Sequence, residues 1–81
     1  MELFYAEAAK QQLKALEYDV QQRILDKLHF YASQPDPLDF AEPLTGLRAH
    51  RFRVGDYRVV FQHDRDLIYV LSIRRRDEAY R

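Results

Sequence analysis

This chain lacks several residue types, and each absence narrows the chemistry that is open to it. It has no cysteine and no tryptophan, and only two glycines and three prolines among 81 residues. Without cysteine there are no disulfide bonds and no thiolate metal ligands. Two glycines are too few for a glycine-rich phosphate-binding loop. The fold must therefore be stabilised by packing alone.

Long apolar runs are also missing. No stretch approaches the roughly 20 residues that a membrane-spanning helix needs. Residues 1–7 have neither the basic start nor the apolar run of a signal peptide. Hydrophobic residues make up 47% of the chain, which is enough for one small core. We therefore expect a single domain over residues 1–81, located in the cytoplasm and without a membrane contact.

The second half of the chain contains no lysine, and the net charge of zero hides a segregation of charge. Residues 1–45 carry four basic residues against eight acidic ones, a net charge of −4. Residues 46–81 carry nine arginines against five acidic residues, a net charge of +4. Arginine presents a planar, permanently charged fork that binds phosphate oxygens in pairs. This pattern favours a nucleic acid as partner, although arginine can also simply cover an exposed sheet.

The first half of the chain has helical periodicity. Residues 1–5 are short and apolar enough for an edge strand, and residues 6–16 repeat apolar positions at intervals of three and four. A second helix is predicted from Asp19, as a capping residue, to the prolines at 35 and 37. Residues 35–47 are predicted to be a loop. The two helices should form an antiparallel hairpin that lies on a sheet.

From His50 the apolar period changes to two, which indicates strands. Strands are predicted over residues 50–54, 57–62 and 67–73, with a type II′ turn at Gly55-Asp56. Residues 63–66 are a second polar turn in this interpretation, and residues 74–81 are a polar tail. The predicted fold class is α+β, with a two-helix hairpin packed on a small, mostly antiparallel sheet.

The two-residue turn also predicts the register of the first hairpin. It places Arg53 directly opposite Arg58, and alternation puts Arg51 on the same face as both. Like charges directly opposite each other destabilise a sheet. A bound phosphate would relieve this repulsion, so we interpret the arginine face as an anion site.

A cluster of arginines without metal ligands can stabilise the negative charge that builds on a phosphate during RNA cleavage. RNA supplies its own nucleophile, the 2′-hydroxyl, so the protein needs one proton acceptor. Tyr80, His50 and His63 are the candidates, but each histidine can equally be a surface or turn residue, and Tyr80 a packing aromatic. The three histidines, His29, His50 and His63, are not spaced as metal ligands are, so we expect neither a metal nor a cofactor.

Four blocks of the sequence carry a resemblance to a known family. They are Leu44–Leu47, Arg51–Phe61, Val70–Ile73 and Arg76–Arg81. Together with the preceding helix hairpin, their order resembles the RelE toxins of bacterial toxin–antitoxin systems, in the RelE/ParE superfamily. The resemblance implies a RelE-like fold, a cognate antitoxin protein as partner, and metal-independent cleavage of mRNA in the ribosomal A site.

The resemblance also assigns roles to individual residues. Arg58 matches the family's strand arginine at the scissile phosphate. Arg76 matches the arginine that stabilises the transition state or the leaving group, and Tyr80 matches the tyrosine proposed as general base and stacking partner. Arg51 and Arg53 stand where other members have lysines, and we expect them to bind RNA.

Three further residues are expected to contact RNA: His50, Arg75 and Arg81. Two other functions are open. Besides the nuclease, the chain could be a ParE-like toxin that inhibits DNA gyrase by binding, or a degenerate toxin that acts as a regulator. The presence of both Arg76 and Tyr80 favours the nuclease, because gyrase inhibitors of this superfamily generally lack that pair.

Overall fold

The computed structural model describes residues 1–46 and 48–76 and forms an α+β fold. In chain order the elements are β1 (Glu2–Tyr5), α1 (Glu7–Lys14), α2 (Tyr18–Ala32), the 3₁₀ helix η1 (Pro37–Phe40), β2 (Glu42–Pro43), β3 (His50–Val54), β4 (Tyr57–Asp64) and β5 (Leu67–Arg75). The sheet has five strands in the order β1-β5-β4-β3-β2. Only β1 and β5 pair in parallel, so the predicted mostly antiparallel sheet is confirmed.

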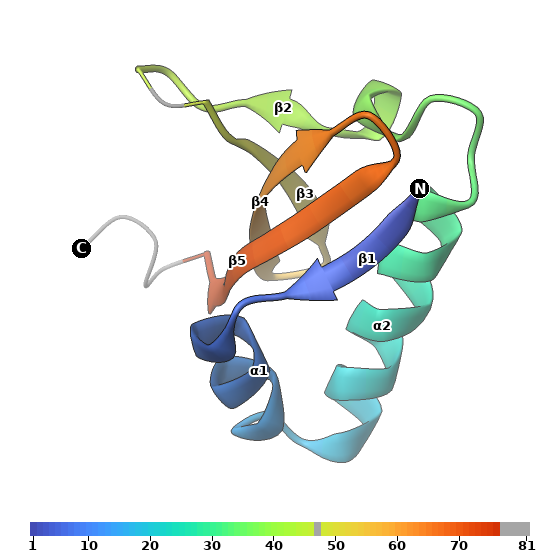
Figure 1. Cartoon of the computed structure of the whole chain (residues 1–81). Helices are drawn as coiled ribbons and strands as arrows, with labels where there is room; N and C mark the ends of the chain where they lie inside the picture. The colour runs from blue at the N-terminus through green and yellow to red at the C-terminus, as the bar shows by residue number, and fades with distance from the viewer. Residues whose placement is uncertain (47, 77–81) are drawn as a thin grey trace.

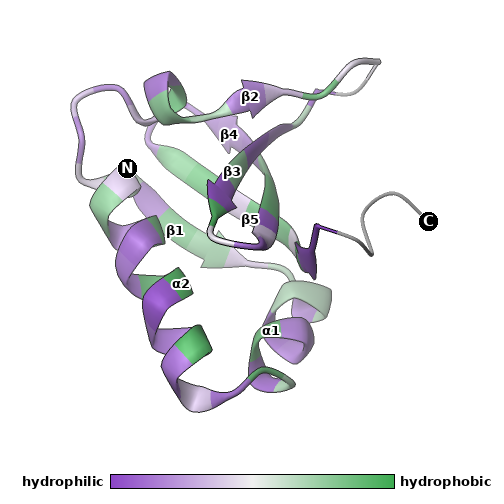
Figure 2. Ribbon diagram, turned by 180° about the vertical axis from the view of Figure 1, so that it is seen from behind, coloured by the Kyte–Doolittle hydropathy of each residue, from purple (hydrophilic) through white to green (hydrophobic). Residues whose placement is uncertain are grey.

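Both helices cover one face of the sheet and run in roughly opposite directions (Figure 1). The α1 helix packs on β5, and α2 packs on β1, β3 and η1. Hydrophobic residues line the sides of α2 and of the strands that face each other (Figure 2). The buried core is built from both layers: Ala9, Ile24, Leu28, Tyr31, Ala32, Phe52, Val54, Val59, Phe61, Ile68, Val70 and Ile73. Within the described part of the chain, no helix is long and apolar enough to cross a membrane.

The start of α2 differs from the prediction. The helix begins at Tyr18 with Glu17 at the N-cap position, and no side chain caps it. Asp19 therefore lies in the first turn, where its negative charge interacts favourably with the helix dipole. The prediction of Asp19 as the cap was wrong because the backbone already turns helical one residue earlier.

The segment predicted as a loop contains regular structure. Residues 37–40 form the single 3₁₀ turn η1, and Glu42–Pro43 form β2, which pairs with β3 at the edge of the sheet. The pairing sets Glu42 directly opposite Arg51 and Pro43 opposite His50. The amide of Leu44 then donates a hydrogen bond to the carbonyl of Ala49 at 3.0 Å. A strand of two residues leaves no periodicity in the sequence, which is why the pattern alone did not indicate it.

The β3–β4 hairpin agrees with the prediction. Gly55 has a φ of +58°, whereas Asp56 is not among the described residues with positive φ. This combination is the one a type II′ turn requires. Val54 pairs with Tyr57, and Arg53 pairs with Arg58, as the two-residue turn implied.

The β4–β5 hairpin is longer than predicted. The turn consists only of Arg65-Asp66, and Arg65 adopts a left-handed φ of 42°. The strand β5 continues to Arg75, so Arg74 and Arg75 belong to the sheet and not to an irregular tail. The register shifts by one residue between Val60 and Phe61. Bulges of this kind re-aim the side chains that follow them.

Candidate functional site

Three arginines lie side by side across three neighbouring strands. Arg53 on β3 pairs with Arg58 on β4, and Arg58 pairs on its other side with Arg74 on β5. Their neighbours along the strands, Val59 and Ile73, are buried beneath the helices. Alternation along each strand therefore directs the three arginines to the opposite face of the sheet. We call Arg53, Arg58 and Arg74 the arginine row.

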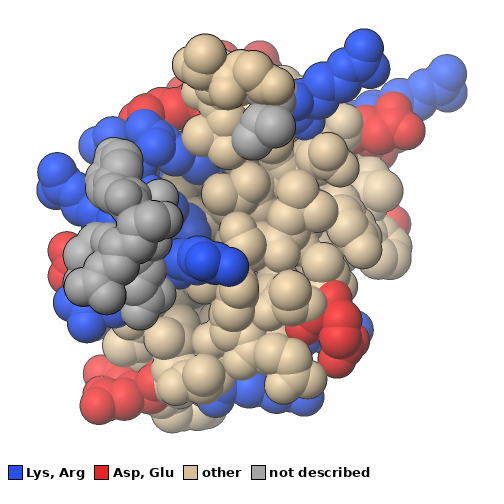
Figure 3. Space-filling model, turned by 90° about the vertical axis from the view of Figure 1, so that its left-hand side faces the viewer, with Lys and Arg blue, Asp and Glu red and all other residues tan. Residues whose placement is uncertain are grey.

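Basic side chains gather on one side of this face (Figure 3). A broad area without charged side chains lies next to them in the same view. The concentration of positive charge at one place, in a chain whose net charge is zero, focuses a positive potential there. The predicted segregation of charge thus corresponds to a surface feature.

Arg58 is the middle member of the arginine row, and it is buried. Only 5% of its surface is exposed. We had expected Arg58 to lie on a solvent-facing site, and its burial in the middle of the sheet, between β3 and β5, shows that this expectation was wrong. A buried arginine stem packs like an apolar side chain, so Arg58 contributes to the structure as well as to the charge of the site.

Glu42 forms ion pairs with two predicted RNA-binding residues. One carboxylate oxygen accepts a hydrogen bond from the Nη2 group of Arg51 at 2.8 Å. The other oxygen lies 3.2 Å from Nε of Arg53. The hydrogen bond from Arg51, and the positive charges of Arg53, Arg51 and Arg58, lower the pKa of the Glu42 carboxyl group. Glu42, an acid of the same chain, thus offsets the repulsion between Arg53 and Arg58. The sequence analysis had assigned this role to a bound phosphate.

The last described residues separate to different sides. Arg75 pairs with Tyr57, and alternation places it on the helix side of β5. A hollow of about 350 Å³ at this end of the strand is lined by both Arg74 and Arg75, together with Tyr57 and Gln12. Arg75 therefore lies outside the arginine row, which Arg74 completes instead, and a contact of Arg75 with RNA stays a prediction. The backbone amide of Arg76 donates a hydrogen bond to the carbonyl of Asp56 at 2.7 Å, which holds Arg76 beside the β3–β4 turn.

His50 does not lie with the arginines. Its ring stacks on Phe61 at 5.8 Å, and the ring of His63 lies 5.3 Å away. Both histidines share the strand face of Phe52 and Phe61, so His50 lies on the other face of the sheet from the arginine row, and its contact with RNA stays a prediction. The alternation of β3 already contained this signal, because His50 is two residues from the buried Phe52. The two histidines are therefore separated from the arginine row by the sheet itself.

Two predicted site residues, Tyr80 and Arg81, lie outside the described residues. The described residues also include no group of three or more histidine or acidic side chains placed to hold a metal ion. The sequence interpretation missed two members of the site, Arg74 and Glu42. Arg74 required the register of β4 and β5, and Glu42 required the short strand β2.

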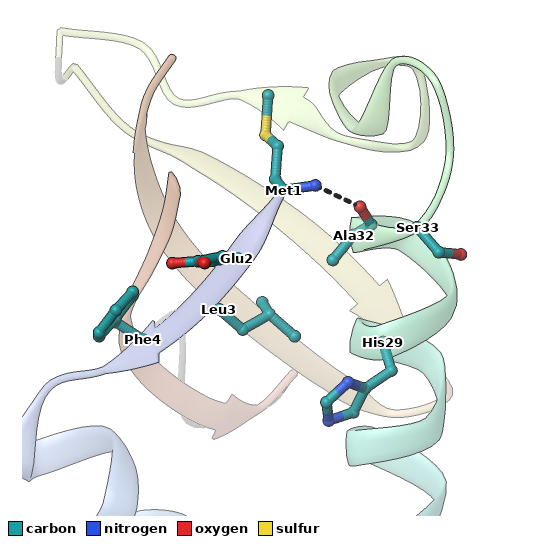
Figure 4. A pocket seen from close by; sticks show the side chains of 7 residues that line it. All are labelled: Met1, Glu2, Leu3, Phe4, His29, Ala32 and Ser33. Atoms are coloured by element: carbon teal, nitrogen blue, oxygen red, sulfur yellow. Dashed lines mark hydrogen bonds between the residues drawn. The ribbon is translucent and has the colours of Figure 1, made fainter. Parts of the chain in front are cut away.

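A second hollow lies elsewhere in the molecule. It has a volume of about 610 Å³, is open to solvent, and is lined by β1 and the end of α2, including Leu3, Phe4 and His29 (Figure 4). At its rim the amino group of Met1 donates a hydrogen bond to the carbonyl of Ala32 at 2.7 Å. The described residues that line this hollow include no arginine.

Comparison with known proteins agrees with this architecture. The sequence model of one family, the ParE toxin of the type II toxin–antitoxin system parDE, matches residues 3–80. This chain belongs to the RelE/ParE toxin superfamily. It is a toxin of a type II toxin–antitoxin system. A comparison with curated proteins gave no match.

Solved structures of RelE toxins share the fold. The RelBE2 toxin–antitoxin complex of Mycobacterium tuberculosis matches with a TM-score of 0.82 and 19% identity, over 91% of this chain and 88% of that chain. The isolated RelE toxin of E. coli gives a TM-score of 0.74 and 22% identity, over 96% of this chain and 88% of that chain. The intact RelBE complex of E. coli gives a TM-score of 0.73 and 20% identity, over 90% of this chain and 93% of that chain. The predicted RelE-like fold of this toxin is confirmed.

Proposed function

We propose that this toxin stops translation by cutting mRNA in the ribosomal A site. The observation that supports this proposal is the arginine row, Arg53, Arg58 and Arg74, on one face of the sheet beside Arg76. Three guanidinium groups on neighbouring strands suit a polyanion better than a neutral or cationic partner. The proposal places the toxin in the cytoplasm, where ribosomes and mRNA are found.

The reaction follows from the chemistry of RNA. The 2′-hydroxyl oxygen attacks the adjacent phosphorus atom, loses its proton to a base, and the bond from phosphorus to the 5′-oxygen breaks. The 5′-oxygen takes up a proton, and a cyclic phosphate remains. Arg58 and Arg76 would stabilise the charge on the phosphate and on the leaving oxygen. The two histidines lie across the sheet from the row, which leaves Tyr80, assigned by resemblance, as the proton acceptor.

Docking on the ribosome must rely on this face. The chain has no net charge, and its first 45 residues carry a net charge of −4, so the molecule as a whole is not attracted to RNA. The arginines at positions 51 and 53 carry a fixed charge and cannot exchange a proton at neutral pH, unlike lysines. We therefore assign them to phosphate binding and not to acid–base catalysis.

The antitoxin is the second proposed partner. Homologous toxins have been crystallised as complexes with RelB antitoxins from Mycobacterium tuberculosis and Methanococcus jannaschii. We propose that a cognate antitoxin, acidic where it meets the arginine row, binds this toxin and blocks the face. A protein partner with carboxylates at that place would satisfy the same guanidinium groups as the RNA.

The proposal is tested in a purified translation system in which the 5′ ends of the mRNA are mapped after the toxin is added. We expect cuts within A-site codons, and no cuts when ribosomes are left out. Arg76→Ala and Tyr80→Phe should abolish the cuts, whereas Asp26→Asn, an exposed acid on α2, should leave them unchanged. Equal cutting of free RNA, or an absence of cuts with a folded toxin, contradicts the proposed mechanism.

A second function has one observation in its favour. The matching family model is that of ParE toxins, and it spans residues 3–80. A ParE-like toxin would inhibit DNA gyrase by binding, without cutting RNA. A gyrase supercoiling assay separates the two functions: inhibition at toxin concentrations that leave mRNA intact would establish the ParE-like activity.

A further inference from the structure

Glu42 occupies the place of an anion at one end of the arginine site. Its two carboxylate oxygens bind different guanidinium groups, Arg51 at 2.8 Å and Arg53 at 3.2 Å. A phosphate group uses its oxygens in the same way when it bridges two arginines. The carboxylate thus makes the contacts that an RNA phosphate would need at this position.

We propose that Glu42 is a built-in competitor of the RNA phosphate, so that RNA gains Arg51 and Arg53 only when this carboxylate releases them. This inference rests on the proposed function, because it names the regulation of the same RNA-binding face. Because Glu42 competes with the RNA phosphate, RNA binds more weakly than the number of arginines suggests. The competition also ties access to the site to the position of β2.

The structure around Glu42 allows the carboxylate to leave. Both residues of β2 are exposed, and the strand has only two residues at the edge of the sheet. Its second residue, Pro43, has no amide hydrogen to donate, so β2 is bonded to β3 by fewer hydrogen bonds than a regular strand. Glu42 and Arg53 remain about half exposed, at 48% and 57%. An ion pair that is exposed to this degree is weak, so another anion can displace Glu42 from Arg53. Arg51 is less exposed, at 22%, and its pair with Glu42 is the stronger of the two.

The alternative role of Glu42 is to position the two arginines for RNA. The two roles predict opposite effects when the charge of Glu42 is removed. A competitor, once neutralised, leaves more positive charge for the RNA, so binding becomes tighter. A positioning residue, once neutralised, lets the arginines lose their orientation, so binding becomes weaker.

The experiment compares wild-type toxin with Glu42→Gln by fluorescence anisotropy on a short single-stranded uridine oligonucleotide over a range of salt concentrations. Glutamine keeps the size of the side chain and removes its charge. We expect roughly fivefold tighter binding at low salt, and a salt dependence that is steeper by about 0.7, the value for one additional phosphate contact on a single strand. Glu17→Gln, an exposed glutamate outside the sheet, is the matched control and should bind as the wild type does.

A double variant shows whether the gain passes through the arginines. Arg53→Gln added to Glu42→Gln should remove most of the gain in affinity. Equal or weaker binding by Glu42→Gln overturns the inference, and so does a lack of RNA binding by all variants. Tighter binding by Glu42→Gln without mRNA cuts during translation would reject the proposed nuclease and leave the competition intact. Mapped cuts during translation, together with unchanged RNA binding by Glu42→Gln, would support the proposed nuclease and reject the competition.

Discussion

Arg74 lies directly opposite Arg58 on the neighbouring strand, and both are on the face of the sheet that the helices leave uncovered. Arg58 faces Arg53 in the same way on its other side. Like charges in such positions destabilise a sheet by themselves. The fold keeps them with the help of Glu42, which binds Arg53 at the end of the row. This arrangement is the basis of the following predictions.

Arg58→Ala should destabilise the toxin as well as impair its function. Arg58 is 5% exposed, and alanine removes a buried stem and the contacts of its guanidinium group. We expect the free energy of unfolding to fall by about 1–3 kcal/mol in urea denaturation. Arg58→Lys keeps the stem and the charge, and should remain folded while losing paired contacts to phosphate. An alanine variant as stable as the wild type contradicts the buried placement.

Arg74→Ala and Arg75→Ala form a matched pair, because the two residues are adjacent but lie on opposite sides of the sheet. Arg74→Ala should weaken binding of a single-stranded RNA oligonucleotide and reduce the slope of its salt dependence by about 0.7. Arg75→Ala should change affinity much less, since Arg75 pairs with Tyr57, outside the arginine row, and alternation along β5 places it on the other face from Arg74. Equal losses in the two variants, measured by fluorescence anisotropy, would show that the row is not the binding surface.

Gln12 should stabilise the sheet through one partly buried hydrogen bond. Its side-chain oxygen accepts a hydrogen bond from the backbone amide of Ile73 at 2.7 Å. Ile73 lies on β5 beyond Val70, the last residue of that strand that pairs with β1. Gln12→Ala leaves this amide without its acceptor, and we expect a loss of about 1–3 kcal/mol in the free energy of unfolding. Gln12→Glu keeps an acceptor and should lose less. Gln11→Ala is the control, because the side-chain amide of Gln11 donates a hydrogen bond to the exposed Glu7. Similar unfolding curves for the Gln12 and Gln11 alanine variants would refute this role.

The carboxyl group of Glu42 should titrate below its ordinary pKa of 4.5, because Arg51 donates a hydrogen bond to its charged form. A carboxyl group whose pKa is lowered by folding stabilises the fold above its ordinary pKa. That contribution is lost as the pH falls through the lowered value. The carboxyl carbon of Glu42, followed by NMR against pH, should show a higher pKa in Arg51→Gln. Arg23→Gln, on the exposed side of α2, should leave it unchanged.

Much of the fold follows from local patterns. The helical spacing before residue 34 and the alternation after residue 50 indicated both helices and three strands. The Gly55-Asp56 turn gave the pairing of Arg53 with Arg58. Local signals were too weak for β2, which has only two residues, and for the first residue of α2, which has no capping side chain.

The site was predictable only in part. Arg51, Arg53 and Arg58 were correctly placed on one face, because two-residue turns and alternation are local properties. Glu42, the partner of Arg51 and Arg53, was not predicted, because it belongs to a connection that has no periodicity in the sequence. The burial of Arg58 was not predicted either, because alternation gives the face of a residue but not its exposure.

The amino-acid sequence by itself determined the helix hairpin, the alternating strands and the charge-bearing face of β3 and β4. Only the tertiary structure decided which arginine completes that face. A regular hairpin from Arg65-Asp66 would pair Arg58 with Ile73, whereas the bulge between Val60 and Phe61 moves the register by one residue and pairs it with Arg74. Each single-residue shift turns every later side chain to the other face. The packing of Ile73 in the core, and not any local propensity, selects this register.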